Sequence, residues 1–551
     1  MAELKDRIEW IGPSRRMIIV SAFIAFSMIS TMHVSNSSQG EPTEETVLRL
    51  GVMQKVDSLN PFIGMTDTSR ILYGLLYDSL QAVGSDLQST PNLALNWEIA
   101  EDYTPYGSVW EYEITPNARW HDGEPLTADD VVFTVNLNAD YYAMMWAYQP
   151  YAFYMDYAEK MDDYTVRIHF YDRATTEPMP VAYADSIFMP IVPKHLLESM
   201  TVAQIGFDWT GVFASSNPPI VGSGPFMATE TIYDDFLECE KITLVKNPNY
   251  HWAADRDVET RFDRVEMHFY LDETALSMAL QQGHLDVAQL PPEEYSVLKD
   301  DVLEGSVTDI ETFDGPKCTQ YWTHVLICMS EYGDNPSRLD PTIRQAMTMA
   351  TDKTFIVDAY YQGLADEGST LIPPANEEWH YELTEEERYD FDLAAANALL
   401  EAGGYLFTPW SPTVRVCTAD SYAVQEGLVP EDTPLTYDMV VRQEAPEEKD
   451  IAMYLESEWA KIGIELNYRI MPEAQLGAVV YSYNYDTAIW YWSSDPDPNY
   501  MLFCQSENSW NGWSDNMYST PEYEQNYTAS ITTMDRSDRA EYVDNCQKIH
   551  Y

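Results

Sequence analysis

The pattern of apolar and polar residues is most informative between residues 97 and 132. The stretch 110–114 (WEYEI) places apolar side chains at every second position, which predicts a half-buried strand. The HDGEP segment at 121–125 then predicts a turn. Thr127 and Asp130 have the spacing of a capping box ahead of an apolar run, so a helix is predicted to begin there.

The same two patterns recur along the chain. Alternation predicts strands at 166–170, 242–245 and 265–269. Asp272 and Gly283 are suited to begin and to end the helix that follows the third of these strands. Strands and helices that alternate in this way indicate the layers of an α/β fold.

Two further helices are predicted in the second half of the chain. Apolar residues within 343–350 have the spacing of one helix face. Asp352 is expected to cap the next helix, which is predicted to bury Phe355, Ile356 and Ala359 and to end at Gly363. We interpret these apolar faces as core packing, so they belong to the scaffold and not to a site.

Composition sets the next limits. The chain has 551 residues, of which 45% are apolar, enough to fill the cores of two or three domain-sized units. Its 31 basic and 90 acidic residues give a net charge of −59, which disfavours nucleic acid and anionic membranes as partners. Molar salt screens charges to within about 3 Å. Two interpretations therefore stay open: a halophile-like protein from a host in high salt, or an ordinary acidic secreted protein.

The N-terminal region has the pattern of a targeting segment. Arg15 and Arg16 precede an apolar run, Met17 to Met32, that is shorter than the about 20 residues of a spanning helix. The segment 17–34 is predicted to be either a cleaved export signal or a retained membrane anchor, with residues 35–45 as a tether in the second case. The rest of the chain is expected outside the cytoplasm, secreted or held at the cell surface.

The six cysteines form no C-x-x-C pair, so neither a zinc ribbon nor a redox motif is supported. Cys318 and Cys328 are the nearest candidates for a disulfide bond, although spacing alone does not establish one. The alternative is that most of the cysteines are small buried apolar residues. Because the first cysteine is Cys239, lipid attachment through an N-terminal cysteine is excluded.

One segment resembles the central signature of the family 5 extracellular solute-binding proteins, the receptors of dipeptide, oligopeptide and nickel ABC importers. The family pattern is R-W-x-D-G-x-P-L-T-A-x-D-V-V-F, and the matching residues are Arg119, Trp120, Asp122, Gly123, Pro125, Leu126, Thr127, Ala128, Asp130, Val131, Val132 and Phe133. Other stretches resemble the family in the same order: LGVMQKVDSLNP (50–61), PNLA (91–94), GSGPF (222–226), NPNY (247–250), LLEAGGY (399–405) and KIGI (461–464). The resemblance covers roughly residues 47–551.

This resemblance implies an α/β class, bilobed type II periplasmic-binding-protein-like fold with an extra subdomain inserted in lobe one. The expected segments are 1–46 for the export signal or anchor and its tether, 47–88 and 206–312 for lobe one, 89–205 for the inserted subdomain, 313–505 for lobe two and 506–551 for a return to lobe one. The family pattern continues through further strands, so we interpret this return as truncated at Tyr551.

The segment Trp490–Tyr500 (WYWSSDPDPNY) is the best local candidate for a ligand site, because it combines aromatic residues with carboxylates. Its adjacent aromatic residues are predicted to send side chains to both faces of a strand. The resemblance implies that the aspartate three residues after Trp492, which is Asp495, pairs with the ammonium group of a peptide. Because the loop is shorter than in the family, Asp497 is the alternative. A structural role for both, as caps of the loop, also stays open.

The resemblance places backbone groups of Thr66 to Ser69 and the strand at Tyr321 and Trp322 on the facing wall. The HDG sequence at 121–123 is interpreted as a structural turn and not as a catalytic or metal site. The candidate ligand-binding residues are Asp495, Asp497, Trp492, Trp490, Tyr321, Trp322, Thr66 and Ser69, and no catalytic residue, metal or cofactor is predicted.

We therefore expect a monomeric extracytoplasmic substrate-binding protein that closes two lobes around a peptide or a similar small polar solute and delivers it to an ABC permease. The first alternative is a ligand receptor that feeds a membrane sensor, which the sequence does not separate from transport. The second is a secreted hydrolase, which is disfavoured because the chain contains neither H-E-x-x-H nor G-x-S-x-G.

Overall fold

The computed structural model describes residues 16–19, 33–34, 45–84, 88–100, 102, 105–207, 209, 219–229, 240–256, 259–313, 321–493, 496–510 and 513–551. The chain divides into two compact units: unit 1 comprises 1–319 and 529–539, and unit 2 comprises 320–528 and 540–551. Of the expected return to lobe one, only Ala529–Arg539 belongs to unit 1. The finer segment boundaries stay a prediction. No helix within the described ranges is long and apolar enough to cross a membrane.

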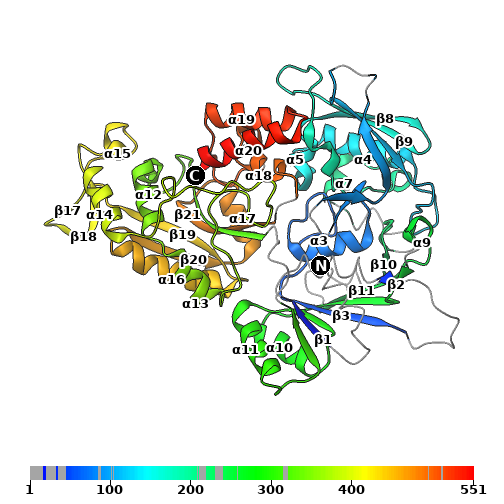
Figure 1. The fold of residues 1–551 in the computed structure, drawn as a ribbon, viewed down its shortest axis with the longest axis horizontal. Coiled ribbons are helices and arrows are strands. Elements are labelled where there is room, and N and C mark those ends of the chain that lie inside the picture. Colours follow the sequence, from blue (N-terminus) through cyan, green and yellow to red (C-terminus); the bar gives the residue numbers. More distant parts are fainter. Residues whose placement is uncertain are drawn as a thin grey trace. The chain divides into compact units, whose positions relative to one another are not determined.

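Unit 1 is built on a seven-stranded sheet (Figure 1). The strand order is β10 (Phe226–Ala228), β11 (Lys241–Lys246), β13 (Arg264–Phe269), β3 (Val47–Val52), β14 (Val287–Gln289), β1 (Arg16–Ile19) and β15 (Ile310–Phe313). β3 pairs in parallel with β13 and β14, and Leu48 and Leu50 on this strand are buried. Gly51 permits a close approach, because a Cβ atom there would lie 2.4 Å from the side chain of Leu285.

β1 comes from the predicted export segment and pairs in parallel with both β14 and β15. A two-residue strand, β2 (His33–Val34), pairs with β12 (Glu259–Thr260). Residues 20–32, the larger part of the predicted signal or anchor, lie outside the described residues. The export role of this segment therefore stays a prediction.

Helices α3 (Asp67–Leu76), α9 (Trp252–Arg256), α10 (Glu273–Gln281) and α11 (Pro292–Leu303) also belong to unit 1. The predicted ends of α10 are confirmed. The Asp272 side chain accepts a 2.8 Å hydrogen bond from the amide of Ala275, and Gly283 has the left-handed φ of 80°. The apolar side of α10 buries Leu276 and Leu280.

A second sheet in unit 1 is four-stranded and antiparallel. Its order is β6 (Ala94–Ile99), β7 (Val109–Ile114), β9 (Thr165–Phe170) and β8 (Met155–Asp162), and a small pair, β4 (Gln81–Val83) and β5 (Ser89–Pro91), precedes it along the chain. Helix α4 (Ala128–Asp140) packs against β8 and is followed by α5 (Gln149–Ala152), α6 (Lys194–Leu197) and α7 (Val202–Phe207). The strands predicted at 110–114 and 166–170 and the capping box of Thr127 and Asp130 are confirmed.

Unit 2 contains a four-stranded sheet with the order β16 (Tyr321–Ile327), β21 (Thr487–Ser493), β19 (Thr436–Arg442) and β20 (Glu465–Met471). β19 is parallel to both β20 and β21, whereas β16 is antiparallel to β21. The helices are α12 (Pro341–Met349), α13 (Lys353–Tyr360), α14 (Leu393–Ala402), α15 (Tyr422–Gln425), α16 (Pro446–Ala460), α17 (Glu473–Val480) and α18 (Asn499–Cys504). The C-terminal helices α19 (Pro521–Thr532) and α20 (Arg536–His550) each have residues in both units.

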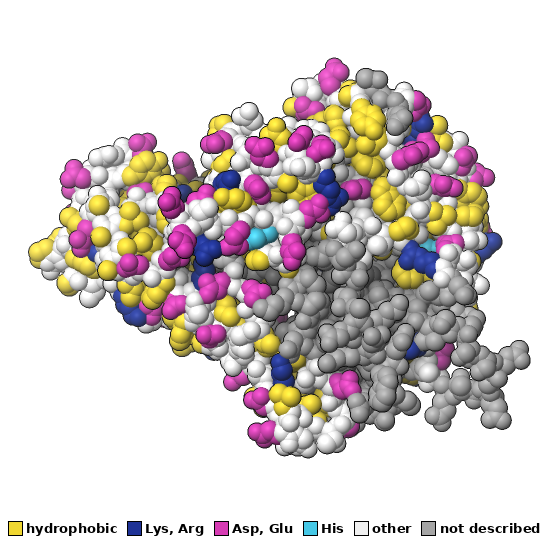
Figure 2. All heavy atoms as spheres, in the orientation of Figure 1, with side chains coloured by type: hydrophobic (Ala, Val, Ile, Leu, Met, Phe, Trp, Pro, Cys, Tyr) yellow, Lys and Arg dark blue, Asp and Glu magenta, His cyan; other side chains and the backbone are white. Residues whose placement is uncertain are grey.

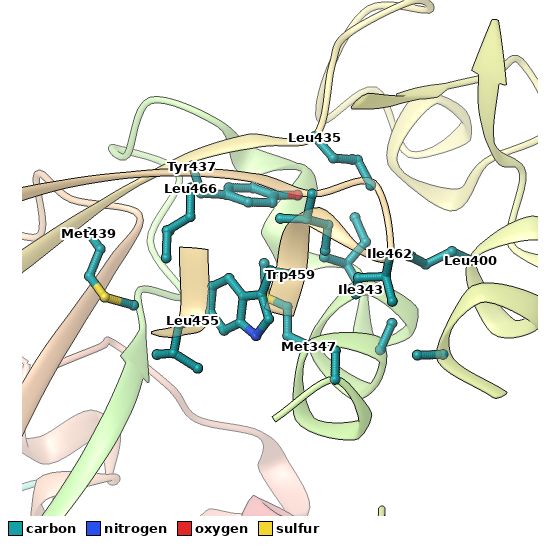
Figure 3. Close-up of a cluster of buried hydrophobic side chains, with 14 of the residues drawn as sticks. Ile343, Met347, Leu400, Leu435, Tyr437, Met439, Leu455, Trp459, Ile462 and Leu466 are labelled. Atoms are coloured by element: carbon teal, nitrogen blue, oxygen red, sulfur yellow. The ribbon is translucent and has the colours of Figure 1, made fainter. Parts of the chain in front are cut away.

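The main core of unit 2 lies between this sheet and helices α12, α14 and α16 (Figure 3). It contains Ile343, Met347, Leu400, Leu435, Tyr437, Met439, Leu455, Trp459, Ile462 and Leu466. The predicted apolar face of 343–350 is therefore confirmed. The predicted burial of Phe355 was wrong: its side chain is 44% exposed, because it stacks on Tyr454 at the surface with ring centroids 4.9 Å apart.

The described cysteines Cys328, Cys417, Cys504 and Cys546 are buried, and Cys328, Cys417 and Cys546 are free thiols. Cys239 and Cys318 lie outside the described residues. The predicted candidate pair of Cys318 and Cys328 therefore lies partly outside the described residues. Burial raises the pKa of the Cys546 thiol, so this residue packs as a small apolar side chain.

Candidate functional site

One edge of the unit 2 sheet gathers most of the predicted ligand-binding residues. The parallel strands β19, β20 and β21 end there at Arg442, Met471 and Ser493. β16 runs the other way and begins at the same edge, with Tyr321 opposite Ser493. Ligands of α/β proteins bind beyond the carboxyl ends of parallel strands, so this is the edge at which a ligand is expected.

The indole side chains of this edge share one face of the sheet. Trp322 pairs with Trp492, and His324 pairs with Trp490 on the neighbouring strand. Residues two apart in a strand point to the same side, which puts all four rings together. Trp322 stacks on His324 with centroids 4.3 Å apart, whereas Trp492 stacks on Trp513 at 4.9 Å. The predicted split of adjacent aromatic residues between two faces is confirmed, because Tyr491 packs on the opposite side.

A buried carboxyl group fixes the position of Trp492. Its indole Nε1 donates a 2.5 Å hydrogen bond to Oδ2 of Asp515, a residue with no exposed surface. The other oxygen of Asp515 has no hydrogen-bond partner among the described residues. Burial raises the pKa of Asp515 to about 8, and the bond from Trp492 opposes that rise only in part. Asp515 is therefore mostly protonated at neutral pH.

On the opposite face, a guanidinium group lies among carboxylates. The Arg442 guanidinium stacks on the Tyr491 ring at 4.0 Å and donates a 2.6 Å hydrogen bond to Glu448. Glu473 lies 3.7 Å from the same guanidinium and accepts a 2.5 Å hydrogen bond from the Tyr491 hydroxyl. Burial raises the pKa of Glu448 to about 7, although Arg442 favours its charged form.

The loop after β21 contains the two predicted aspartates. Asp497 is buried, and its Oδ1 accepts a 2.8 Å hydrogen bond from the amide of Asn499 at the start of α18. This is the capping role that the sequence left open. Asn376 donates a 2.9 Å hydrogen bond to the carbonyl of Pro496 and so holds the loop from another segment of unit 2. Asp495 and the side chain of Tyr321 lie outside the described residues.

Thr66 and Ser69, which were expected on the facing wall, belong to unit 1. Thr66 is the N-cap of α3, and its Oγ1 accepts a hydrogen bond of 3.2 Å from the Ser69 amide. The Ser69 hydroxyl donates to Asp57 at 2.6 Å. Both side chains are thus engaged in the cap, and the proposed contact of this segment with a ligand stays a prediction.

His121 in unit 1 has structural partners. The amide of Gly222 donates to Nδ1 of His121 at 3.1 Å, and His121 Nε2 lies 3.0 Å from the carbonyl of Gly224. The HDG segment therefore forms a turn against residues 222–224, as expected. Among the described residues, no group of three or more His, Cys, Asp and Glu side chains is arranged to hold a metal ion.

The buried histidine His251 connects two aspartates. Its Nδ1 lies 2.7 Å from Asp255, and its Nε2 lies 3.7 Å from Asp78. Thr115 and Asn117 also donate to Asp255, at 3.0 and 2.6 Å, so the cluster ties α9 to the end of strand β7. Burial alone would lower the pKa of His251, but the bonds and charges of the two aspartates outweigh it and raise that pKa.

Asp515 and the cluster of Arg442, Glu448 and Glu473 were missed by the sequence analysis. Nothing in the sequence distinguishes these acidic residues from the other members of a set of 90. Only the contact with Trp492, 23 residues away along the chain, marks Asp515. The signal available for Arg442 was its place at the end of a predictable strand.

Comparison with known proteins agrees with this architecture. The model of the bacterial extracellular solute-binding proteins, family 5 Middle, matches residues 88–513. The chain therefore belongs to this family of solute-binding proteins, which confirms the predicted fold class and the predicted class of function.

Two relatives illustrate the likeness. The oligopeptide-binding protein AppA of Bacillus subtilis is 24% identical over 514 residues, which are 89% of this chain and 82% of the relative. The structure of that protein with a nonapeptide has a TM-score of 0.71 at 19% identity and covers 92% of this chain and 91% of its own. An oligopeptide-binding protein of Thermotoga maritima with bound mannohexaose also has a TM-score of 0.71, at 19% identity, with 92% of this chain and 89% of that chain covered.

Proposed function

We propose that this solute-binding protein is the extracytoplasmic receptor of an ABC importer and that it captures a peptide or a similar small polar solute for delivery to a membrane permease. Family membership and the oligopeptide-binding relatives support this proposal. A related scaffold holds mannohexaose, so the scaffold alone does not fix the ligand.

The observation that carries the peptide assignment is the edge of the unit 2 sheet. Trp322 and Trp492 are paired across two strands there, and the loop with Asp495 and Asp497 follows directly. Indole rings supply the apolar contact area, and a carboxylate supplies the charge-assisted hydrogen bond that an ammonium group requires. Pockets for small ligands combine these two kinds of group.

Within this proposal, Asp495 is the favoured partner of the ligand ammonium. Asp497 is 6% exposed and already accepts the Asn499 amide, which leaves its carboxylate engaged in the start of α18. A charge-assisted hydrogen bond contributes about 1.5–3 kcal/mol, so its loss weakens binding about tenfold or more. Trp490, Trp492, Trp322 and Tyr321 would supply the surrounding contacts, with backbone groups of Thr66–Ser69 as a further contribution.

The test is a titration of intrinsic tryptophan emission with matched ligands. A peptide with a free N-terminus is compared with the same peptide after N-acetylation, alongside an oligosaccharide and a nickel–histidine complex. We expect the free peptide to bind at least tenfold more tightly than the acetylated one. Asp495→Asn should remove that difference, whereas Asp497→Asn should retain it.

Mass spectrometry of the molecule that copurifies with the protein provides an independent identification. If neither peptides nor the other ligands change the emission, and nothing copurifies, the receptor assignment fails. If a sugar or a metal complex binds and peptides do not, the receptor assignment stands but the peptide assignment is wrong. Comparable X-ray scattering with and without a proven ligand would contradict closure on binding.

A further inference from the structure

The hairpin of β17 (Tyr405–Thr408) and β18 (Ser411–Cys417) ends in an exposed apolar tip. The side chains of Leu406, Phe407 and Trp410 are 40%, 43% and 59% exposed. Pro409, Pro412 and Thr413 are exposed as well. Hydrophobic side chains gather at the left extremity of unit 2 in Figure 2, where Figure 1 shows β17 and β18.

The tip carries no charge. No charged residue occurs from Ala402 to Val414, although 22% of all residues are charged and the net charge is −59. The first charge of the hairpin, Arg415, is 1% exposed. Its guanidinium donates to the carbonyls of Tyr405 and Ile462 and lies 4.4 Å from the centroid of the Phe407 ring. Arg415 therefore anchors the base of the hairpin and is not presented at its surface.

The hydroxyl groups of Thr408 and Ser411 are hydrogen-bonded within the hairpin. The Ser411 amide donates to the Thr408 hydroxyl at 3.1 Å, and the Ser411 hydroxyl donates to the carbonyl of Val414 at 2.6 Å. Pro409 and Pro412 have no N–H group to satisfy. An apolar environment penalises polar groups that lack partners. This tip can therefore leave water without breaking its own hydrogen bonds.

We propose that this hairpin tip inserts into the interfacial region of a lipid bilayer with uncharged headgroups. Tryptophan favours that region, because its ring is apolar and its N–H remains able to donate. A docking surface for a protein normally combines its apolar centre with arginine and a polar rim, and residues 402–414 provide no charged side chain. An uncharged tip on so acidic a chain touches a neutral surface without the repulsion that an anionic one would cause.

This inference goes beyond solute binding and does not depend on the identity of the solute. A second, reversible contact with the membrane would hold the receptor near the bilayer in which its permease lies. Membrane attachment commonly combines two weak contacts, because one alone gives only marginal binding.

The test is co-sedimentation of the whole chain with phosphatidylcholine vesicles in molar salt, which screens the net charge. The readout is the ratio of the partition coefficients of wild type and variant, because the N-terminal segment 17–34 is common to both. We expect wild-type protein to partition onto the vesicles and Trp410→Ser to lower the partition coefficient about tenfold, because it removes one large apolar side chain. Trp410→Phe should retain most of the binding. Phosphatidylglycerol vesicles at low salt should bind less than phosphatidylcholine.

Leu271→Ser is the matched control, because Leu271 is 85% exposed in unit 1 and its loss should leave vesicle binding unchanged. Thermal unfolding verifies that each variant folds. The proposal is overturned if wild-type protein does not partition, or if Trp410→Ser and Leu271→Ser behave alike. It is also overturned if analytical ultracentrifugation shows that Trp410→Ser converts a dimer into monomers. The same holds if Trp410→Ser abolishes binding to the purified permease in detergent while vesicle binding persists.

Discussion

Trp492 and Asp515 form a buried hydrogen-bonded pair in which the indole N–H donates to a carboxyl group that has no exposed surface. Trp492 is the penultimate residue of β21, immediately before the predicted ligand loop. Asp515 therefore determines the orientation of a ring that the proposed function places next to the solute. The pair links a carboxyl group, whose pKa burial raises to about 8, to the geometry of the candidate site.

Replacement of Asp515 should remove part of the dependence of the free energy of unfolding on pH. Its folded pKa of about 8 lies above the value of about 3.9 for an unfolded aspartate. The folded state then binds more protons than the unfolded state between these values, so stability falls as pH rises through that window. The amide side chain in Asp515→Asn does not titrate. Within this window, the free energy of unfolding of the variant should therefore rise relative to that of wild type by up to about 1.4 kcal/mol for each pH unit.

Urea unfolding at pH 5 and pH 8 in the same salt measures this effect. Asp420→Asn serves as the control, because Asp420 is an exposed aspartate in unit 2. This variant should change the free energy of unfolding by the same amount at both pH values. Parallel pH profiles of wild type and Asp515→Asn would show that the carboxyl group does not titrate in this range.

The His251 cluster predicts a second pH dependence, in unit 1, and its histidine acts in the same direction as Asp515. A raised histidine pKa stabilises the fold fully below about 6.5, and this contribution disappears as pH rises through the folded pKa. The pKa values of Asp78 and Asp255 are lowered, so these carboxylates stabilise the fold above about pH 3.9. This contribution is lost as pH falls. His251→Gln should therefore lose about 3–5 kcal/mol, most clearly between these limits.

Chemical unfolding from pH 4 to pH 9 should show the difference between wild type and His251→Gln shrinking on the alkaline side. His284→Gln changes an exposed histidine and should be neutral throughout. A loss that is constant with pH would indicate a packing defect and not an ionic one.

The Arg442 cluster can be tested with a double-mutant cycle. Arg442→Met leaves Glu448 buried without its cation and should cost about 3–5 kcal/mol at pH 8. The loss should be smaller at pH 5, because Glu448, with a pKa of about 7, is then protonated. Adding Glu448→Gln should recover most of the loss at pH 8.

Arg469→Met provides the comparison for this cycle. Arg469 is 54% exposed and lies 3.6 Å from Asp438, so its removal should cost less than about 1 kcal/mol. Additive effects of Arg442→Met and Glu448→Gln would mean that the two groups are not coupled.

Asp130 holds the start of α4 more firmly than a surface cap does. Its two oxygens accept the amides of Thr127 and Lys194 at 2.9 and 3.0 Å, and the residue is 5% exposed. Asp130→Ala should destabilise unit 1 by about 1–3 kcal/mol, because it leaves buried amides without acceptors. The adjacent Asp129→Ala, at an exposed ion pair, should cost no more than about 1 kcal/mol, and thermal unfolding compares the two. Equal losses would refute this reasoning.

The sequence predicted the elements whose signals are local. The alternation at 110–114, the cap at Asp272 and the capping box of Thr127 and Asp130 all depend on neighbours within a few residues. The prediction for Phe355 failed because an apolar residue at a helical position does not reveal whether another layer covers it. Here the rings of Tyr454 and Tyr360 cover it only in part.

The candidate site could be predicted only in part for a similar reason. The alternation of Trp490, Tyr491 and Trp492 is local and was predictable, but their partners come from distant segments. Asp515 and Arg442 reach the two faces of β21 only after the chain has folded. No spacing rule identifies a buried carboxylate among so many acidic residues.

The pairing of β3 with β13 has a consequence for the making of the protein. Val47–Val52 at one end of unit 1 must wait until Arg264–Phe269 has been synthesised before its hydrogen bonds can form. Contacts so far apart in the chain form slowly, since a long loop must close first. A nascent chain with this topology emerges from the ribosome with an unpaired apolar strand, and a chaperone that binds extended segments would have time to act on it.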